Sequence, residues 1–139
     1  KLNEENERRI RELLRKEHGM SAYAVLNLSK IDLALKRSAV VIDGLYSWEE
    51  YTFLKNYYGD SFCVIAVWAS PKTRYARLAA RVERPLTGEE AASRDKAEVE
   101  KIGKSGPIAM ADFTILNEVS LENMEREVKK AISTLKDKD

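Results

Sequence analysis

The chain has 139 residues, of which 44% are hydrophobic and 34% are charged, a composition typical of a single globular domain. Its 24 basic and 23 acidic residues nearly cancel, which argues against the extended basic surface that nucleic-acid-binding proteins use. No apolar run reaches the roughly 20 residues of a membrane-spanning helix, and the single cysteine, Cys63, excludes a disulfide framework. We therefore expect a cytoplasmic protein with one domain over residues 1–139 and no nucleic-acid or membrane partner.

Two helices are predicted within residues 1–37. Asn3 is a candidate N-cap for the first, which has an apolar inner face and is expected to end at Gly19. Ser21 is the candidate N-cap of the second, which is expected to extend toward Lys36.

A wholly apolar run, Ala39–Ile42, is followed at once by Asp43 and Gly44. Such a run is typical of a buried strand in a parallel sheet, and the change to Asp-Gly marks its carboxyl end. Open α/β sheets bind their ligands at that edge. Asp43 is therefore a candidate for binding a metal ion or an acceptor hydroxyl, the alternative being an aspartate that only caps a turn.

The next helix is predicted to start at Ser47, because Ser47 and Glu50 have the spacing of a capping box and Tyr46 is placed to pack against Tyr51. It is expected to end near Gly59. Tyr46 is also a candidate for lining an acceptor pocket, although an aromatic residue beside a cap more often belongs to the core.

Two further apolar runs predict strands, one within Ser61–Trp68 and one at Phe113–Asn117. Together with Ala39–Ile42 they alternate with helical patterns along the chain. This alternation predicts an α/β fold with a parallel sheet, right-handed crossovers and helices flanking the sheet in three layers.

The helix after the second predicted strand is expected to begin at Pro71, with Ser70 as its N-cap, and to end before Pro85. Arginines fall on one of its faces and apolar residues on the other. A guanidinium group binds phosphate oxygens in pairs and stays charged, so this face is a candidate phosphate-binding surface. The alternative is a solvated face that pairs with nearby acidic residues. The four arginines are Arg74, Arg77, Arg81 and Arg84.

Beyond Pro85, Thr87 and Glu90 predict the capping box of a helix that carries Arg94. A turn is expected at Gly103–Pro107, and Ser120 is the candidate N-cap of a final amphipathic helix.

Four stretches occur in a characteristic order: Val40–Gly44, the pair Arg77-x-x-x-Arg81, Ser93-Arg94-Asp95, and Asn117–Ser120. In this order they resemble the P-loop nucleotide kinases of the adenylate kinase and dephospho-CoA kinase type, over nearly the whole chain. The nearest pattern is that of the small, poorly characterised kinases related to dephospho-CoA kinase. These share the Ile-Asp-Gly strand end, the Ser-Pro-Lys-Thr-Arg helix start and the Ile-Ala-Met-Ala-Asp run.

The resemblance implies transfer of a phosphoryl group from ATP, with Mg²⁺, to a nucleotide-like or coenzyme-like small molecule. It implies that residues 1–37 form helices on the acceptor side and that residues 84–95 form a lid-like segment. The site residues that it implies are Asp43 (also the metal ligand), Arg81 and Arg94 for catalysis, Arg77, Arg81, Asn117 and Ser120 for ATP, and Gly44, Tyr46 and Arg15 for the acceptor.

The family's N-terminal strand and its Gly-x-x-x-x-Gly-Lys-Ser/Thr loop do not occur in the printed sequence. Gly103-Lys104-Ser105 does not supply the loop, because Glu98 stands where its first glycine belongs and the run follows a helix. We therefore expect a fragment that lacks the central strand of its sheet, is inactive or impaired as a kinase, and could form a homodimer.

Two alternative functions remain open from the sequence. One is a non-catalytic nucleotide-binding or protein-interaction module. The other, weaker one is a flavodoxin-like signalling module, which would need an acidic pocket at the strand ends, and Asp43 alone does not make one.

Overall fold

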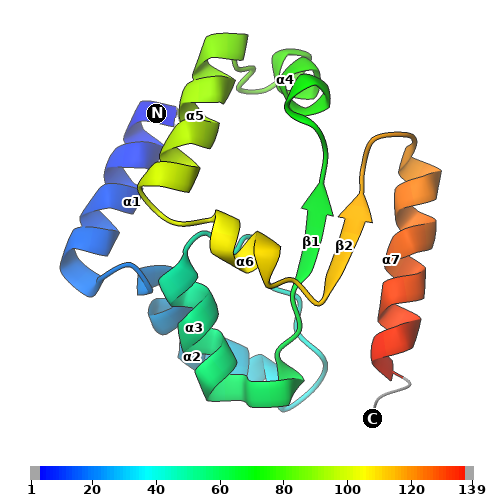
Figure 1. Ribbon diagram of the computed structural model, residues 1–139. Helices are drawn as coiled ribbons and strands as arrows, with labels where there is room; N and C mark the ends of the chain where they lie inside the picture. Colours follow the sequence, from blue (N-terminus) through cyan, green and yellow to red (C-terminus); the bar gives the residue numbers. More distant parts are fainter. Residues whose placement is uncertain (1–3, 137–139) are drawn as a thin grey trace. The chain divides into compact units, whose positions relative to one another are not determined.

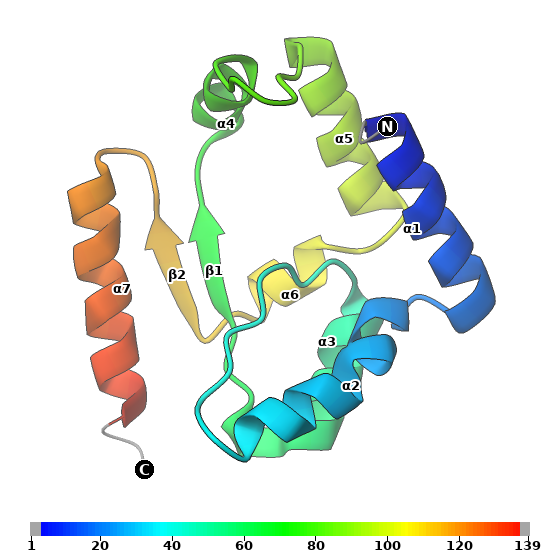
Figure 2. The ribbon, with the colours of Figure 1, turned by 180° about the vertical axis from the view of Figure 1, so that it is seen from behind.

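The computed structural model describes residues 4–136, which form two compact units, each built from two segments of the chain. The first unit comprises the described residues up to Phe62 together with Lys96–Pro107, and the second comprises Cys63–Asp95 together with the described residues from Ile108 onward. Figures 1 and 2 show the elements from opposite sides. The predicted organisation as one domain stays a prediction.

The first unit is helical. Its long helices are α1 (Glu4–His18), α2 (Ala22–Leu35) and α3 (Trp48–Tyr58), and α3 continues into the short 3-10 helix η1 (Gly59–Ser61). Helices α2 and α3 lie side by side (Figures 1 and 2). The buried core of this unit comes mainly from these two helices and consists of Ala22, Ala24, Ile31, Tyr51 and Leu54, with the polar residues Ser47 and Glu50.

The start of α3 confirms the predicted capping box and corrects one of its bonds. The hydroxyl of Ser47 accepts from the backbone N–H of Glu50 at 3.1 Å, as expected. The Glu50 carboxylate returns to the backbone N–H of Tyr46, one residue before the N-cap, at 2.9 Å. The ring of Tyr46 lies 6.2 Å from that of Tyr23, while Tyr51 stacks on Trp48 with ring centroids 5.2 Å apart.

A shared carboxylate ties the far ends of α2 and α3 together. Asp32 accepts a hydrogen bond from the hydroxyl of Tyr57 at 3.0 Å and another from the hydroxyl of Tyr58 at 2.8 Å. Burial, and then the hydrogen bond to Asp32, raises the pKa of Tyr58 to about 12. Each carboxylate oxygen therefore satisfies one tyrosine, which fixes the register of the two helices.

The prediction of a strand at Ala39–Ile42 is wrong for the residues that the structure describes. The segment follows the turn after α2 as irregular chain without a strand partner. Val41 is 95% exposed and Ile42 is 44% exposed, so the run is not buried either. A strand requires a neighbour to satisfy its backbone N–H and C=O groups, and the residues that the structure describes provide no such neighbour for this segment.

The second unit contains the sheet, which has two parallel strands among the described residues, β1 (Ile65–Trp68) and β2 (Phe113–Leu116). Ile65 pairs with Phe113 and Trp68 pairs with Leu116. The two strands point the same way, with α7 (Leu121–Lys136) beside β2 (Figure 1). The α/β class and the parallel pairing are therefore confirmed. The buried residues of this unit are Ala66, Ala69, Ala91, Ile115 and Ala131.

Backbone bonds extend the pairing beyond both ends of the strands. The N–H of Asp112 donates to the carbonyl of Val64 at 2.9 Å, and the carboxylate of Asp112 accepts from the N–H of Val64 at 2.8 Å. At the carboxyl end, the N–H of Asn117 donates to the carbonyl of Trp68 at 2.7 Å. The carboxyl ends of β1 and β2 are thus held together where the loops to α4 and α7 begin.

Helix α4 (Pro71–Ala79) is shorter than predicted. Its start is as expected, because the Ser70 hydroxyl accepts from the N–H of Thr73 at 3.3 Å. It ends at Ala79, and the backbone N–H of its C-cap residue Ala80 donates to the carbonyls of Ala76 and Leu78. Further along, Arg84 has a φ of 53° and so lies outside the helical region, which is disfavoured for a residue before proline. Arg81 and Arg84 therefore lie beyond the helix, and the predicted ladder of four arginines on one helix face is reduced to Arg74 and Arg77.

Two further helices lie between α4 and β2. Helix α5 (Gly88–Glu100) begins at the predicted capping box, in which the hydroxyl of Thr87 accepts from the N–H of Glu90 at 3.2 Å. Helix α6 (Ser105–Ala109) occupies part of the segment predicted as a turn.

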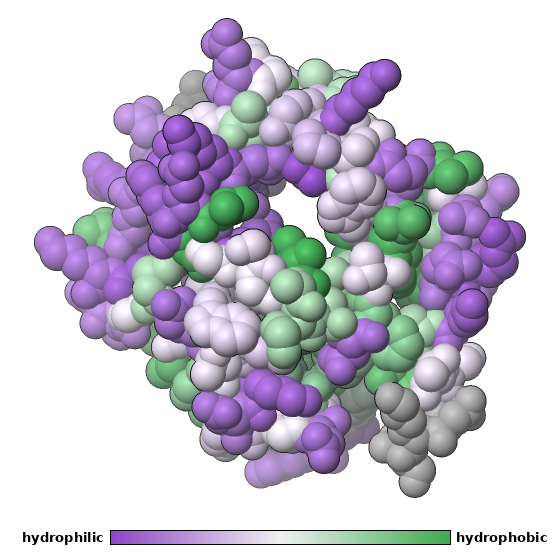
Figure 3. All heavy atoms as spheres, in the orientation of Figure 1, coloured by the Kyte–Doolittle hydropathy of each residue, from purple (hydrophilic) through white to green (hydrophobic). Residues whose placement is uncertain are grey.

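Hydrophilic side chains cover the outer side of α7 (Figure 3). None of the described helices is long and apolar enough to cross a lipid bilayer.

Candidate functional site

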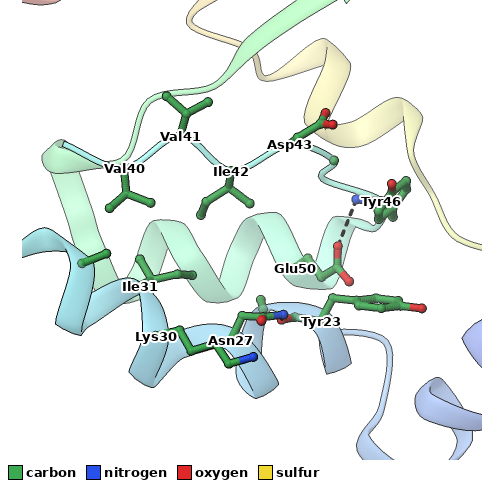
Figure 4. A pocket seen from close by; sticks show the side chains of 13 residues that line it. Tyr23, Asn27, Lys30, Ile31, Val40, Val41, Ile42, Asp43, Tyr46 and Glu50 are labelled. Atoms are coloured by element: carbon green, nitrogen blue, oxygen red, sulfur yellow. Dashed lines mark hydrogen bonds between the residues drawn. The ribbon is translucent and has the colours of Figure 1, made fainter. Parts of the chain in front are cut away.

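The first unit contains a pocket with a cavity volume of about 390 Å³ between α2 and the segment that leads into α3 (Figure 4). One wall is the α2 face that carries Tyr23, Asn27 and Lys30, and the other is the segment Val40–Gly44. Tyr46 and Glu50 line the end of the pocket at the start of α3. The pocket therefore combines apolar walls with a few polar groups, as small-molecule sites usually do.

Asp43 and Gly44 form a tight corner on this pocket. Gly44 has a φ of +89°, and a Cβ atom added there would lie 2.6 Å from the hydroxyl oxygen of Tyr46. Both the backbone conformation and the close approach of Tyr46 therefore require glycine. Asp43 is exposed, and its carboxylate points away from α2 (Figure 4). The predicted residues Asp43, Gly44 and Tyr46 are thus brought together, although no strand supports them.

Glu50 is the most unusual residue of the pocket, because it is only 2% exposed. Burial raises the pKa of its carboxyl group, while the backbone N–H of Tyr46 and the positive charge of Arg15 act in the opposite direction. The guanidinium carbon of Arg15 lies 5.9 Å from the ring centroid of Tyr23. Arg15 was expected to bind the acceptor, and the structure places it beside two residues that line the pocket.

A second cation of the first unit, Lys104, lies near Tyr46. The ammonium group of Lys104 lies 5.6 Å from the ring centroid of Tyr46 and 2.6 Å from a carboxylate oxygen of Glu98. The segment that carries Lys104 rests against Trp48, because Gly106 approaches the indole so closely that a Cβ atom there would lie 2.6 Å from the ring. The sequence analysis did not single out Lys104, since its relation to Tyr46 depends on residues far apart in the chain.

In the second unit, the structure brings together Arg77 and Asn117, two residues for which the resemblance implies a role in binding ATP. The Nη1 atom of Arg77 donates to the backbone carbonyl of Asn117 at 2.8 Å. Arg74 is held differently: it donates to the carbonyl of Ala69 at 2.8 Å and forms an ion pair with Asp95. Arg77 thus lies at the carboxyl ends of the two strands, whereas Arg74 has a structural partner.

Glu118 is a residue of this region that the sequence analysis missed. Its carboxylate accepts from the hydroxyl of Thr73 at 2.6 Å and from the backbone N–H of Ser70. These two bonds hold the pKa of Glu118 below its ordinary value. The carboxylate thereby fastens the loop after β2 to the start of α4. Its position directly after Asn117 was the only signal in the sequence.

The other predicted nucleotide-binding residues are placed separately. Arg81 is exposed beyond the end of α4, and no hydrogen bond or ion pair among the described residues joins it to Arg77 or Asn117. Arg94 is half-buried on α5. The hydroxyl of Ser120 accepts from the N–H of Asn123 at 3.2 Å and so acts as the N-cap of α7, as the sequence also predicts.

The fit of Mg²⁺ to this chain rests on Asp43. Over residues 4–136, no three His, Cys, Asp or Glu side chains gather into a metal-binding group. Mg²⁺ keeps several waters and is commonly held by one or two carboxylates together with substrate phosphates. An exposed carboxylate on the rim of a pocket fits that donor set.

Comparison with curated proteins places the chain in a family. No protein-family model matches it. A UPF0200 protein of Hyperthermus butylicus is 38% identical over 133 residues, which are 94% of this chain and 69% of that protein. The UPF0200 protein TK1334 of Thermococcus kodakarensis is 38% identical over 138 residues, covering 96% of this chain and 74% of that protein. A third, from Sulfurisphaera tokodaii, is 33% identical over 92% of this chain and 68% of its own length. The chain belongs to the UPF0200 family.

Proposed function

We propose that this chain carries the acceptor-binding pocket and part of the nucleotide site of an ATP-dependent phosphotransferase that acts on a nucleotide-like or coenzyme-like small molecule. The observation that carries the proposal is the corner at Asp43 and Gly44. It presents an open carboxylate at the rim of a pocket of about 390 Å³ with apolar walls and polar ends. The order of motifs along the chain supports the same reaction class.

In this proposal Asp43 would hold Mg²⁺ together with phosphate oxygens, and the ion would supply positive charge that offsets the charge of the phosphoryl group. The acceptor occupies the pocket, and Asp43 orients its hydroxyl or phosphate. Phosphoryl transfer needs positioning and positive charge more than covalent help from the protein, so one carboxylate is sufficient on the acceptor side.

Residues of the second unit bind the nucleotide in this proposal. Arg77 and Asn117 contact the base, with Ser120 in the same loop. Arg81 and Arg94 supply positive charge to the phosphates. The hydrogen bond from Arg77 to the Asn117 carbonyl supports a common role for these two residues, because it orients the planar guanidinium group.

The test has two parts. Acceptor binding is measured by titration calorimetry on this chain with a panel of AMP, CMP and dephospho-CoA in the presence of Mg²⁺, for the wild type and for Asp43→Asn. Asp60→Asn serves as the matched control, because Asp60 is an exposed aspartate on η1. We expect Asp43→Asn to weaken Mg²⁺-dependent binding by about tenfold or more, and Asp60→Asn to leave it unchanged.

Transfer itself is measured with the Thermococcus kodakarensis relative, by following the γ-phosphoryl group of ATP in the presence of the same panel. Phosphorylation of a panel member that also binds this chain supports the proposal. No saturable binding to this chain, or no transfer to any acceptor that binds, would contradict it.

A non-catalytic interaction module is the second candidate, and exposed apolar side chains favour it. Val41 is 95% exposed in the first unit, and Leu116, at the end of β2, is 57% exposed in the second. This candidate predicts ligand binding by the chain without phosphoryl transfer by the relative.

A further inference from the structure

Asp43 and Gly44 form the one Asp-Gly pair of the sequence, which contains no Asn-Gly pair. In an Asp-Gly pair the backbone nitrogen of the glycine can attack the side-chain carboxyl carbon of the aspartate, because the glycine has no Cβ atom to hinder the approach. Folded proteins suppress this attack where hydrogen bonds hold the backbone in place. The reactivity of the pair in the native chain therefore depends on what holds this corner.

The backbone at the corner makes no hydrogen bond to any residue that the structure describes. No backbone N–H or carbonyl group of residues 39–45 is bonded, and these residues belong to no helix or strand. The first bonded group after them is the N–H of Tyr46, which donates to Glu50 at 2.9 Å. The N–H of Gly44 is thus available, and rotation of the backbone at Asp43 breaks no hydrogen bond.

The side chain of Asp43 is also available. It is exposed, its carboxylate points away from α2, and no hydrogen bond or ion pair joins it to another of the residues 4–136 (Figure 4). By contrast, the carboxylates of Asp32, Asp95 and Asp112 all accept hydrogen bonds. Asp43 therefore combines a glycine neighbour with an unrestrained carboxyl group.

The glycine of this pair is required by the fold of the corner. Gly44 has a φ of +89°, and a Cβ atom there would lie 2.6 Å from the hydroxyl oxygen of Tyr46. A larger residue would hinder attack on the preceding aspartate, but it would be strained in this conformation. The rim of the pocket thus depends on the same glycine that makes the pair reactive.

We propose that Asp43 isomerises spontaneously to isoaspartate in the folded chain. The nitrogen of Gly44 forms a bond to Cγ of Asp43 and loses its proton, the carboxyl group loses its hydroxyl, and one water leaves as a five-membered succinimide forms. Water then opens the ring. Cleavage of the bond between nitrogen and Cγ restores aspartate, whereas cleavage of the bond between nitrogen and the backbone carbonyl carbon gives isoaspartate. No co-reactant other than water is needed.

The product has a different corner. In isoaspartate the main chain runs through Cβ and Cγ and is longer by one carbon atom, and the free carboxylate is attached directly to Cα. The carboxylate at the rim of the pocket therefore changes its position and its reach. This inference depends on the local structure around Asp43 and is independent of phosphoryl transfer.

The experiment ages the folded chain for several weeks in neutral buffer, below its unfolding temperature, beside the isolated peptide that trypsin releases, residues 38–55. Asp43 is the only aspartate of that peptide. Isoaspartate is counted by methyl transfer from S-adenosylmethionine with protein isoaspartate methyltransferase, and it is located by peptide mapping. We expect the rate at Asp43 in the folded chain to lie within about tenfold of the rate in the peptide, which corresponds to a local opening free energy below about 1.4 kcal/mol.

Two variants test the chemistry at a side chain whose replacement removes no contact. Asp43→Glu keeps a carboxylate, but ring closure would require a six-membered ring, so isoaspartate formation in this peptide should be lost. Asp43→Asn should react faster than the wild type, because an amide resists attack by a nucleophile less than an ionised carboxylate does. Each event in Asp43→Asn also adds one negative charge, which isoelectric focusing measures.

Asp60 is the internal control. It is exposed and precedes Ser61, another small residue, but it lies in η1, where the N–H of Phe62 donates to the carbonyl of Gly59. Trypsin releases it in the peptide of residues 56–72, where it is the only aspartate. We expect less isoaspartate at Asp60 than at Asp43.

Three results would overturn the inference. They are a rate at Asp43 that is more than about tenfold slower in the folded chain than in the peptide, a level no higher than that at Asp60, or isoaspartate that persists in Asp43→Glu. These measurements use no ligand and no catalysis. A lack of acceptor binding or of phosphoryl transfer would therefore contradict the proposed function and leave this inference standing.

Discussion

The contact between Gly106 and Trp48 allows a quantitative prediction for Gly106→Ala. An added Cβ atom would lie 2.6 Å from Cε3 of the indole, 3.3 Å from Cδ2 and 3.4 Å from Cζ3. Carbon atoms normally approach to about 3.5–4.0 Å, so the closest pair overlaps by about 1 Å. Either the indole or the start of α6 must move, and overpacking of this kind costs about 1–3 kcal/mol. We expect the free energy of unfolding to fall by that amount, measured by urea denaturation followed through tryptophan fluorescence and circular dichroism.

Two controls isolate the steric cause. Gly88→Ala changes a glycine at the start of α5 whose added Cβ would have nothing within 4 Å, so it should be neutral or stabilise the chain by about 0.4–1 kcal/mol. In a Trp48→Ala background the obstructing ring is gone, and Gly106→Ala should then cost less than about 0.5 kcal/mol. An equal loss in both backgrounds, or a loss below about 0.5 kcal/mol in the wild type, would refute the reasoning.

Three other contacts give predictions of the same kind. The pKa of Glu118 is lowered in the folded state, so its ionised form stabilises the fold at neutral pH, and this contribution is lost as the pH falls below about 4.5. Glu118→Gln should therefore weaken the dependence of the unfolding free energy on pH in that range. An unchanged dependence below pH 4.5 would contradict this prediction. Asp32→Ala should lower the pKa of Tyr58 from about 12 toward 10 in a tyrosinate absorbance titration, though not fully, because burial contributes as well; an unchanged titration would show that Asp32 has no such role. Ser70→Ala should lower the free energy of unfolding by about 1 kcal/mol, because α4 loses its N-cap. The control Ser93→Ala, within α5, should not lower it. Equal free energies of unfolding for the two variants, measured with denaturant, would contradict a capping role for Ser70.

Features that depend on neighbours in the sequence were predicted best. The capping boxes at Ser47 and Thr87 and the N-caps at Ser70 and Ser120 all form, because each requires only residues three positions apart. The two strands of the sheet were also found, since apolar runs bounded by turn residues are a local signal. Ser21 is the exception, because its side chain makes no cap hydrogen bond.

Features that depend on distant partners were predicted poorly. Ala39–Ile42 has the composition of a strand, but composition cannot supply the neighbouring backbone that a strand pairs with. The predicted ladder of arginines extends only to Arg77, because α4 ends at Ala79, several residues before the proline from which its end was predicted.

The candidate site shows the same division. Asp43, Gly44 and Tyr46 were identified from the strand-to-helix corner, and the structure keeps them together on one pocket. Glu50 was recognised only as a capping residue, although it is also buried beside Arg15. Lys104 reaches the site through a contact between residues that lie far apart in the sequence.

The division of each unit into two stretches of chain bears on how the protein acquires its structure. The chain passes from the first unit to the second after Phe62, returns at Lys96, and leaves again after Pro107. Parallel pairing of β1 with β2 joins positions 48 residues apart, and closing a loop of that length costs on the order of 3 kcal/mol in chain entropy. Helices α2 and α3 meet over a shorter separation and can associate earlier. No single cut can release either unit intact, and during synthesis β1 can pair with β2 only after the whole intervening segment, which includes part of the first unit, has been made.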